Sequence, residues 1–139
     1  MSLNLIKLAA GADSLDDLLD WQKHLMATYG RVFNTTRMIP KQANELVNGG
    51  SLYWVIKRKI MARQIILDIE PFTDGAGIRR CHIHLQPDMI LTRPQARRPF
   101  QGWRYLKAGD APPDMPQGVE IDADMPESLR AELTELGLL

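Results

Sequence analysis

The segment from Arg93 to Lys107, RPQARRPFQGWRYLK, has the richest chemistry in the chain, because five Arg or Lys side chains stand among three aromatic rings. Guanidinium groups bind phosphate through paired hydrogen bonds, and aromatic rings stack on nucleic-acid bases for about 1–3 kcal/mol per base. This composition predicts binding of RNA or a nucleotide. The residues of the segment expected to contact such a ligand are Arg97, Arg98, Trp103, Arg104 and Tyr105.

The charges are unevenly distributed along the chain. Residues 31–107 hold 14 of the 17 Lys and Arg but only 5 of the 17 Asp and Glu, whereas residues 1–30 and 108–139 together hold 3 basic and 12 acidic residues. A basic region rich in aromatic side chains favours a polyanionic partner. The alternative is that the acidic ends, or those of a neighbouring molecule, pair with the arginines, while the aromatic rings pack in or over the core. The sequence leaves both interpretations open.

Three further stretches offer candidates for the same surface. Lys57 opens the basic triplet that follows the apolar run Ser51–Ile56, and Trp54 lies within that run. Arg79 and Arg80 begin another predicted strand. We expect Lys57 and the two arginines to contact phosphates and Trp54 to offer a stacking face. For the basic triplet, a solvated turn is the alternative.

His82 and His84 alternate with apolar residues on a predicted strand, so their imidazoles lie on one face about 7 Å apart. That spacing suits a phosphate or a proton carrier. A divalent metal site would need a third ligand, for which Asp68 and Glu70 on the preceding strand are the nearest types. We therefore predict no metal site and no cofactor. A solvated sheet face remains the structural alternative.

No motif of known catalytic chemistry occurs in the sequence. Gly49-Gly50-Ser51 lacks the Lys-Ser/Thr pair of a phosphate loop and is predicted to end a helix and enter a strand. A nucleophile elbow and a His-Glu-x-x-His zinc motif are also absent from the sequence. Whether the protein is an enzyme stays open at this point.

In the first half of the chain, capping and turn residues mark the ends of short predicted elements. Strict alternation predicts a strand over residues 3–8 with Leu3 and Leu5 on one face. Ser14 and Gly30 fit the N-cap and the end of an amphipathic helix that runs to Tyr29. A strand over residues 31–38 and a short helix over residues 41–48, opened by Pro40, are predicted to follow.

The second half is predicted to be mostly strand. After the strand at 51–56, a long strand over residues 60–72 puts Ile65, Leu67 and Ile69 on one face and Ile66, Asp68 and Glu70 on the other. A hairpin loop at 73–77 leads into a return strand at 78–85, with Cys81, Ile83 and Leu85 facing the core. Short strands at 89–92 and 103–106 interrupt irregular chain, and a helix is predicted over residues 126–136.

These elements predict an α+β fold built on a strongly bent, mostly antiparallel sheet or partly open β-barrel. The N-terminal and C-terminal helices are expected to pack on this sheet. At 139 residues the chain fits a single domain over residues 1–139. No apolar run is long enough for a membrane span and no secretory signal is present, so we expect a cytoplasmic protein without membrane contact. The oligomeric state cannot be predicted.

Several stretches resemble an uncharacterised bacterial family, of alphaproteobacterial type, that is catalogued only as a domain of unknown function. The resemblance is carried by residues 36–41, 49–57, 77–81 and 100–107 together with the opening strand, and it implies no activity. In that family the residue after Lys57 is usually glycine. Arg58 departs from this pattern and argues against a tight turn there.

A more distant likeness is to the PUA and ASCH group of small β-barrels, which bind RNA or modified nucleosides. The order Pro40, Leu46, Gly49-Gly50, Tyr53, Lys57 is similar to a short helix leading through glycine into a strand that ends in a basic residue. Some ASCH-like enzymes are amidohydrolases that use a lysine, a threonine and a glutamate. The nearest such types here are Thr36, Lys41 and Glu70.

Three hypotheses therefore follow from the sequence. The first is an RNA-binding or nucleotide-binding module. The second is a small enzyme acting on a modified nucleoside or phosphorylated metabolite, with His82 or His84 carrying a proton. The third is a structural or interaction protein in which basic and acidic regions meet.

Overall fold

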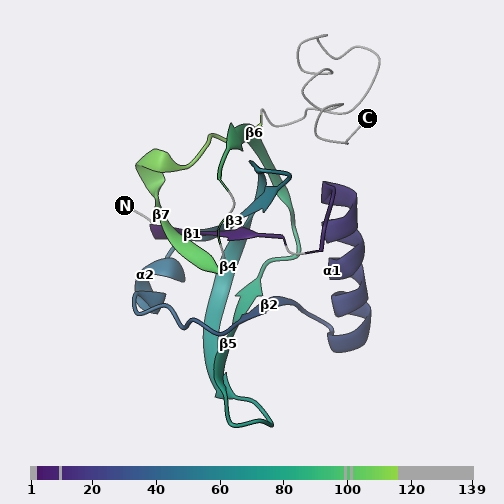
Figure 1. The fold of residues 1–139 in the computed structure, drawn as a ribbon, viewed down its shortest axis with the longest axis vertical. Coiled ribbons are helices and arrows are strands. Elements are labelled where there is room, and N and C mark those ends of the chain that lie inside the picture. Colours follow the sequence, from purple (N-terminus) through teal and green to yellow (C-terminus); the bar gives the residue numbers. More distant parts are fainter. Residues whose placement is uncertain (1–2, 10, 99, 101, 116–139) are drawn as a thin grey trace.

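The fold is a strongly bent sheet with a long helix beside it (Figure 1). The computed structural model describes residues 3–9, 11–98, 100 and 102–115. Its elements, in chain order, are β1 (Leu3–Leu8), α1 (Leu15–Tyr29), β2 (Val32–Thr36), α2 (Ala43–Leu46), β3 (Ser51–Ile56), β4 (Lys59–Thr73), β5 (Arg79–Leu85), β6 (Ile90–Ala96), β7 (Trp103–Lys107) and the 3₁₀ helix η1 (Ala108–Asp110).

Within the described residues, seven strands form one open sheet in the order β2-β5-β4-β3-β1-β7, and β6 pairs with β4. The β1–β3 pair is parallel, and the other strand pairs are antiparallel. The long strand β4 joins the two halves, because its first part pairs with β3 and β6 and its second part with β5. The predicted α+β class with an open, mostly antiparallel sheet is confirmed.

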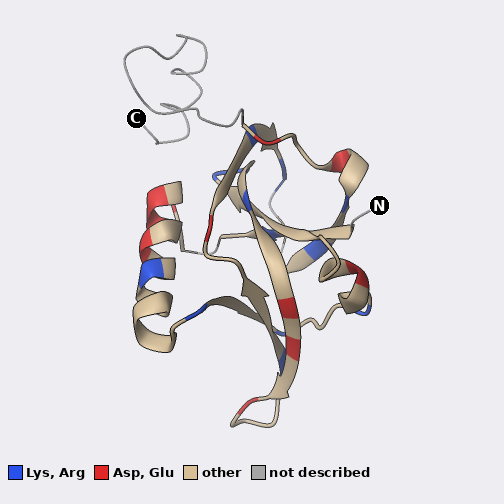
Figure 2. Cartoon of the chain, turned by 180° about the vertical axis from the view of Figure 1, so that it is seen from behind, with Lys and Arg blue, Asp and Glu red and all other residues tan. Residues whose placement is uncertain are grey.

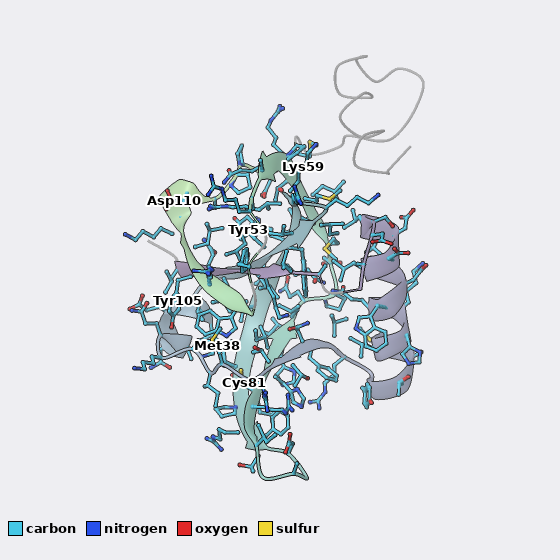
Figure 3. The ribbon with its side chains drawn as sticks, in the orientation of Figure 1. Met38, Tyr53, Lys59, Cys81, Tyr105 and Asp110 are labelled. Atoms are coloured by element: carbon cyan, nitrogen blue, oxygen red, sulfur yellow. The ribbon has the colours of Figure 1, made fainter. Side chains whose placement is uncertain are left out.

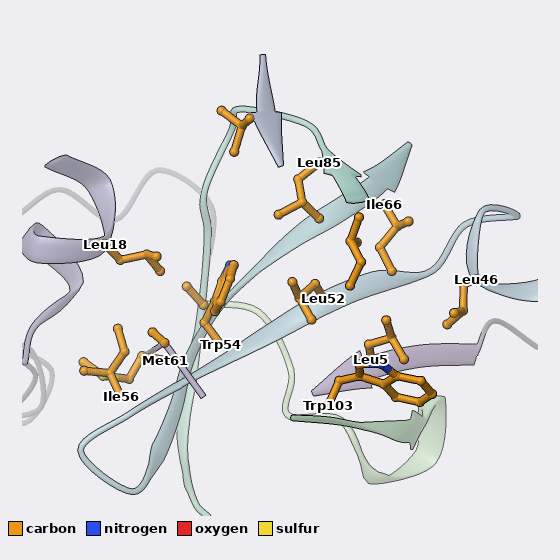
Figure 4. Close-up of a cluster of buried hydrophobic side chains, with 14 of the residues drawn as sticks. Leu5, Leu18, Leu46, Leu52, Trp54, Ile56, Met61, Ile66, Leu85 and Trp103 are labelled. Atoms are coloured by element: carbon orange, nitrogen blue, oxygen red, sulfur yellow. The ribbon is translucent and has the colours of Figure 1, made fainter. Parts of the chain in front are cut away.

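Helix α1 begins and ends where the sequence predicts. The Ser14 hydroxyl accepts the N–H of Asp17 (3.2 Å), and Gly30, at φ 72°, donates its N–H to the Met26 carbonyl (2.9 Å). Leu15 and Leu18 pack into the main core with side chains from the sheet, as Figure 4 shows for Leu18. Local caps and the apolar stripe thus fix both the length of the helix and the face it buries.

A buried polar network also ties α1 to the sheet. The Gln22 and Gln64 side-chain amides exchange two hydrogen bonds of 2.7 Å, and Gln64 Oε1 also accepts the indole N–H of Trp54 (2.9 Å). Gln64 Nε2 further donates to the carbonyl oxygen of Gln86 (3.0 Å). Every polar atom of the Gln64 side chain is therefore satisfied in the core, which is the condition for burying an amide.

The predicted faces of the long strand are wrong in its second half. The pairing of β4 with β5 shifts register between Ile66 and Asp68. Such a bulge inserts an extra residue and resets the alternation. As a result, Ile66 and Ile69 both lie in the core, and the Leu67 side chain is 52% exposed.

Two other sequence predictions differ from the structure in length. The helix predicted over residues 41–48 forms only as α2, which begins after the N-cap residue Gln42. The Gln42 N–H, which has no partner within the helix, donates to the Tyr105 hydroxyl (3.2 Å). Strand β6 continues through Pro94 to Ala96, where irregular chain was predicted, because it pairs with β4 as far as Lys59. The helix predicted over residues 126–136 lies outside the described residues.

Two apolar clusters lie on opposite faces of the sheet. The main cluster lies between the sheet and α1 (Figure 4). The second cluster consists of Ile6, Tyr53, Val55, Ile60 and Leu106, with Leu8, Phe100 and Ala111 packed against it. Because β1 and β7 contribute residues to both clusters, they are covered on both faces. The second face is the one on which the candidate site lies.

No helix in the described part of the chain is long and apolar enough to cross a membrane.

Candidate phosphate-binding site

Three arginines converge on a hollow of about 420 Å³ at the sheet edge, here called the arginine hollow. Strand β7 presents Arg104 and Leu106 on one face, and the antiparallel pairing of Arg104 with Ile6 brings β1 alongside. The chain that leaves β6 supplies the remaining wall. The residues lining the arginine hollow are Ile6, Ala96, Arg97, Arg98, Phe100, Arg104, Tyr105 and Leu106.

The base of the arginine hollow is apolar and its rim is cationic. Ile6 and Leu106 are buried in the second core cluster, and Phe100 packs against it. The Arg104 guanidinium carbon lies 5.4 Å from the centroid of the Phe100 ring, which is within cation–π distance. Aromatic rings and guanidinium groups of this kind are planar groups on which a base can stack.

The positive charge of the arginine hollow is not neutralised by the described residues. Ion pairs in that part of the chain join Arg63 to Asp114, Arg80 to Asp74 and His84 to Glu70. Arg97, Arg98 and Arg104 take part in none of them. The field of these three side chains is therefore available to a ligand.

The Arg97 side chain has a hydrogen-bond donor without an acceptor in the described structure. Its Nε atom is buried and has no hydrogen-bond partner in the described part of the chain. A buried donor without an acceptor costs about 1–3 kcal/mol, and part of that cost is recovered when a ligand oxygen accepts the hydrogen bond. The Nε–H of Arg97 is therefore a buried donor without an acceptor among the described residues.

The β3–β4 turn lies beside the arginine hollow and adds two cations. The Arg97 N–H donates to the carbonyl oxygen of Arg58 (2.7 Å), and Ala96 pairs with Lys59. Lys57 and Arg58, here called the basic turn, are exposed and have φ values of 51° and 67°. Positive φ at both residues is typical of a two-residue hairpin turn, so the tight turn forms despite Arg58.

Figure 2 shows blue Lys and Arg segments around β6 and the β3–β4 turn, and red Asp and Glu segments on α1, α2, η1 and the far half of β4. The left-handed conformation costs roughly 1–2 kcal/mol at each residue that is not glycine. The chain therefore holds two cations under strain next to the three arginines. Strain of this kind clusters at functional sites.

A second hollow of about 380 Å³, here called the polar hollow, lies on the same face of the sheet. Arg63 forms a two-pronged ion pair with Asp114 (2.8 and 2.9 Å) and donates to the Ser51 hydroxyl (2.8 Å). Asn4 Oδ1 accepts the N–H of Ser51 (2.9 Å). The other lining residues are Gly49, Tyr53, Ala108, Ala111, Pro112 and Pro113, and Figure 3 shows Tyr53.

The electrostatics of the polar hollow differ from those of its neighbour. The hydrogen bonds from Arg63 lower the pKa of Asp114, and the same pairing raises the pKa of Arg63. Both groups therefore stay charged and neutralise each other. Burial is the main cause that raises the pKa of Tyr53, so its phenol stays neutral at physiological pH.

The chain belongs to the family described as "Protein of unknown function (DUF1489)", whose family model matches residues 5–139. No curated protein and no solved structure matches it.

A third cluster of this DUF1489 chain lies on the outer face of β2, β4 and β5. The His82 ring stacks on Phe72 with centroids 4.3 Å apart and meets Phe33 edge-on at 4.7 Å. We call Phe33, Phe72, His82 and His84 the imidazole cluster. His82 Nδ1 lies 2.9 Å from the Thr35 hydroxyl, and His84 Nε2 lies 3.1 Å from Glu70 Oε1.

Protonation of the imidazole cluster is constrained by its surroundings. The pKa of His82 is lowered, first by burial and then by repulsion from His84. Hydrogen bonding to His84 is the main cause that lowers the pKa of Glu70. Among the described residues, no group of three or more His, Cys, Asp or Glu side chains is arranged to hold a metal ion.

The predicted site residues do not all come together. Arg97, Arg98, Arg104 and Tyr105 line the arginine hollow, and the turn that contains Lys57 adjoins it. Arg79 and Arg80 lie at the opposite end of β4, up to about 46 Å along the strand from Lys59. Arg80 is also paired with Asp74 at 2.5 Å. His82 and His84 belong to the separate imidazole cluster.

Trp54 and Trp103, the two tryptophans predicted to contact the ligand, are both buried away from the candidate surface. Trp54 is 2% exposed and donates to Gln64, and Trp103 is 8% exposed and donates its indole N–H to the Met38 carbonyl (2.7 Å). Each occupies a strand position that faces the main core, so neither ring face is open to a base. Tyr105, in contrast, is 39% exposed, and Figure 3 shows it on β7.

The nearest types for an amidohydrolase trio do not converge either. Thr36 is buried and pairs with Cys81 on the core side of the sheet. Glu70 pairs with His82, whose side chain lies on the outer face. Thr36 and Glu70 are therefore on opposite faces of one sheet.

Sequence reasoning missed the polar hollow. Alternation in the first strand places Asn4 on the face of Ile6, and alternation in β3 places Ser51 on the face of Tyr53. The sequence therefore indicated which faces these lining residues share. No pattern in the sequence indicated the pairing of Arg63 with Asp114, which are 51 residues apart. Gly50 marks the close approach behind it: a Cβ there would lie 2.3 Å from the carbonyl oxygen of Leu3.

Proposed function

We propose that this chain binds single-stranded RNA, with the arginine hollow and the basic turn holding the phosphate backbone. The observation that carries the proposal is the convergence of Arg97, Arg98 and Arg104, none of them paired with a described carboxylate, on one hollow. Guanidinium groups suit phosphate because they donate two parallel hydrogen bonds to it.

The rest of the hollow supports contact with a base. The Arg104 guanidinium lies over the Phe100 ring in this hollow, 5.4 Å from the ring centroid. The Tyr105 ring packs edge-on against Trp103 on the other face of β7, and its hydroxyl accepts the Gln42 N–H. Single-stranded RNA presents unpaired bases to such planar groups. A volume of about 420 Å³ also lies within the usual range for sites that take small organic groups.

The order of elements around the basic turn supports this proposal. Helix α2 leads through Gly49 and Gly50 into β3, which ends at the basic turn, in the order that resembles the PUA and ASCH group. A cytoplasmic bacterial protein that acts as a single domain would meet RNA as an abundant polyanion. Both remain part of the proposal.

The test is the salt dependence of RNA binding. Fluorescence anisotropy of a short labelled single-stranded RNA, measured between about 50 and 200 mM salt, gives the slope of log K against log salt. Replacing Arg97 and Arg98 together by alanine should flatten that slope by about 1.4, at about 0.7 per lost phosphate contact on a single strand.

The matched control removes two positive charges elsewhere. Arg31 and Arg79, both exposed, lie outside the arginine hollow, so the double alanine variant at these positions has the same net charge as the test variant. We expect its slope to equal that of the wild type. Absent or salt-independent binding, or equal loss in both variants, refutes the proposal.

The imidazole cluster favours a second candidate, proton transfer on a modified nucleoside or phosphorylated metabolite. His84 contacts Glu70, and Phe33 and Phe72 form an apolar wall around His82. The lowered pKa of His82 keeps its imidazole neutral, as a general base requires. A screen over acylated nucleosides, with His82→Ala and His84→Ala as inactive controls, tests it; turnover that survives both substitutions excludes the cluster.

A further inference from the structure

We infer that the polar hollow takes the nucleoside part of a nucleotide whose phosphate lies in the arginine hollow. The inference rests on the proposed function and deepens it, because it assigns a second half of the same site. Strand alternation groups Asn4 with Ile6 and Ser51 with Tyr53, but the sequence did not predict that these residues line a binding site.

The two hollows adjoin along β1. Asn4 and Ile6 lie on the same face of this strand, about 7 Å apart. Ile6 pairs with Arg104 on one side and with Tyr53 on the other. Since Ile6 and Arg104 line the arginine hollow, and Asn4 and Tyr53 line the polar hollow, a ligand of nucleotide size reaches both.

The charges of the two hollows decide which part of the ligand each one takes. In the polar hollow, Arg63 uses its Nε, Nη1 and Nη2 atoms on Asp114 and Ser51. The pair carries no net charge, and three of the five N–H donors of Arg63 are already used within the protein. The arginine hollow has three cations without described carboxylate partners, so the phosphate favours that side.

The groups left in the polar hollow suit an uncharged ring with hydrogen-bonding edges. Asn4 Oδ1 is occupied by the Ser51 N–H, which leaves the amide nitrogen as a donor. The Tyr53 phenol both donates and accepts, and burial keeps it neutral. Pro112 and Pro113 add apolar surface to the lining of this hollow. A nucleobase or nucleoside has both the flat apolar face and the polar edge that this lining requires.

The experiment compares ligands that differ only in the base. Isothermal titration calorimetry of the full chain with the four nucleoside monophosphates, ribose 5-phosphate and inorganic phosphate gives their relative affinities. We expect one or more nucleotides to bind about tenfold or more tightly than ribose 5-phosphate, since each good hydrogen bond is worth about fivefold. Inorganic phosphate should bind most weakly.

The decisive variant is Tyr53→Phe, which removes one hydroxyl and keeps the buried ring. It should weaken binding of the preferred nucleotide about fivefold and leave ribose 5-phosphate unchanged. Tyr29→Phe, on an exposed tyrosine of α1, is the matched control and should change neither affinity. The selective loss is the readout, because a general structural defect would weaken both ligands.

The failure of this inference can be separated from the failure of the proposed function. If ribose 5-phosphate binds as tightly as every nucleotide, or if Tyr53→Phe weakens all ligands equally, the polar hollow does not hold the nucleoside, and salt-dependent RNA binding still stands. If neither RNA nor inorganic phosphate binds, the proposed function is refuted together with the inference.

Discussion

Gln64 makes the most demanding polar contacts in the core, and its replacement tests how α1 is held to the sheet. The side chain is 0% exposed and makes four hydrogen bonds to Gln22, Trp54 and Gln86. Gln64→Leu fills nearly the same volume but leaves the Gln22 amide, the Trp54 N–H and the Gln86 carbonyl without partners. Each buried orphan group costs about 1–3 kcal/mol.

Partial relaxation of Gln22 toward solvent reduces the total, so we expect Gln64→Leu to lower the free energy of unfolding by about 3–4 kcal/mol. For 139 residues, at about 2.1 cal/mol/K per residue, this corresponds to a drop in Tm of roughly 10–14 °C. Urea denaturation followed by circular dichroism, together with thermal scans, measures both quantities.

The double variant Gln22→Leu/Gln64→Leu gives the sign of the coupling. It removes the Gln22 orphan as well, so it should be more stable than Gln64→Leu alone by about 1 kcal/mol. Gln95→Leu, which removes an exposed hydrogen bond to the Asp110 carbonyl, should cost less than about 1 kcal/mol. A loss below about 1 kcal/mol for Gln64→Leu, or a double variant less stable than the single one, would refute the reasoning.

Three further predictions concern the turns and the imidazole cluster. Arg58→Gly removes the cost of a positive φ in the basic turn, so it should stabilise the fold by about 0.5–1 kcal/mol while weakening RNA binding. If urea denaturation shows equal or lower stability, the conformation of Arg58 is not strained. Gly50→Ala should destabilise by more than about 2 kcal/mol, because its Cβ would overlap the carbonyl oxygens of Leu3 and Leu46, whereas Gly75→Ala, with open space around it, should be close to neutral in the same denaturation assay. The folded-state pKa of His82 is lowered, so the stability it contributes is present above its unfolded value near 6.5 and is lost as the pH falls through the folded pKa. His82→Phe should therefore flatten the fall in stability between about pH 7.5 and 5; an unchanged pH profile would show that His82 is not responsible.

The separation of the basic residues into unlike groups bears on every functional test. The central region holds most of the positive charge, yet Arg63 and Arg80 are paired with carboxylates while Arg97, Arg98 and Arg104 are not paired with any described one. Variants that remove positive charges at arbitrary positions would combine the loss of structural ion pairs with the loss of ligand contacts. Comparing positions inside and outside the arginine hollow avoids this.

The sequence by itself determined the elements that depend on neighbouring residues. Ser14 and Gly30 delimit α1 because capping bonds form within a few residues. Cys81 and Ile83 alternate with the two histidines because side chains on a strand point to opposite faces in turn. These effects are local, so the predicted helix and the two-faced strand appear in the structure.

Only the tertiary structure decided which side chains share a hollow and which are withdrawn into the core. Trp103 and Arg104 are neighbours in sequence, but the pairing of β7 with β1 directs the first into the core and the second into the arginine hollow. The ion pair of Arg63 with Asp114 and the shift of register at Leu67 likewise depend on strands far apart in the chain. Such pairings are selected by the sum of packing over the whole sheet, which no short stretch of residues encodes.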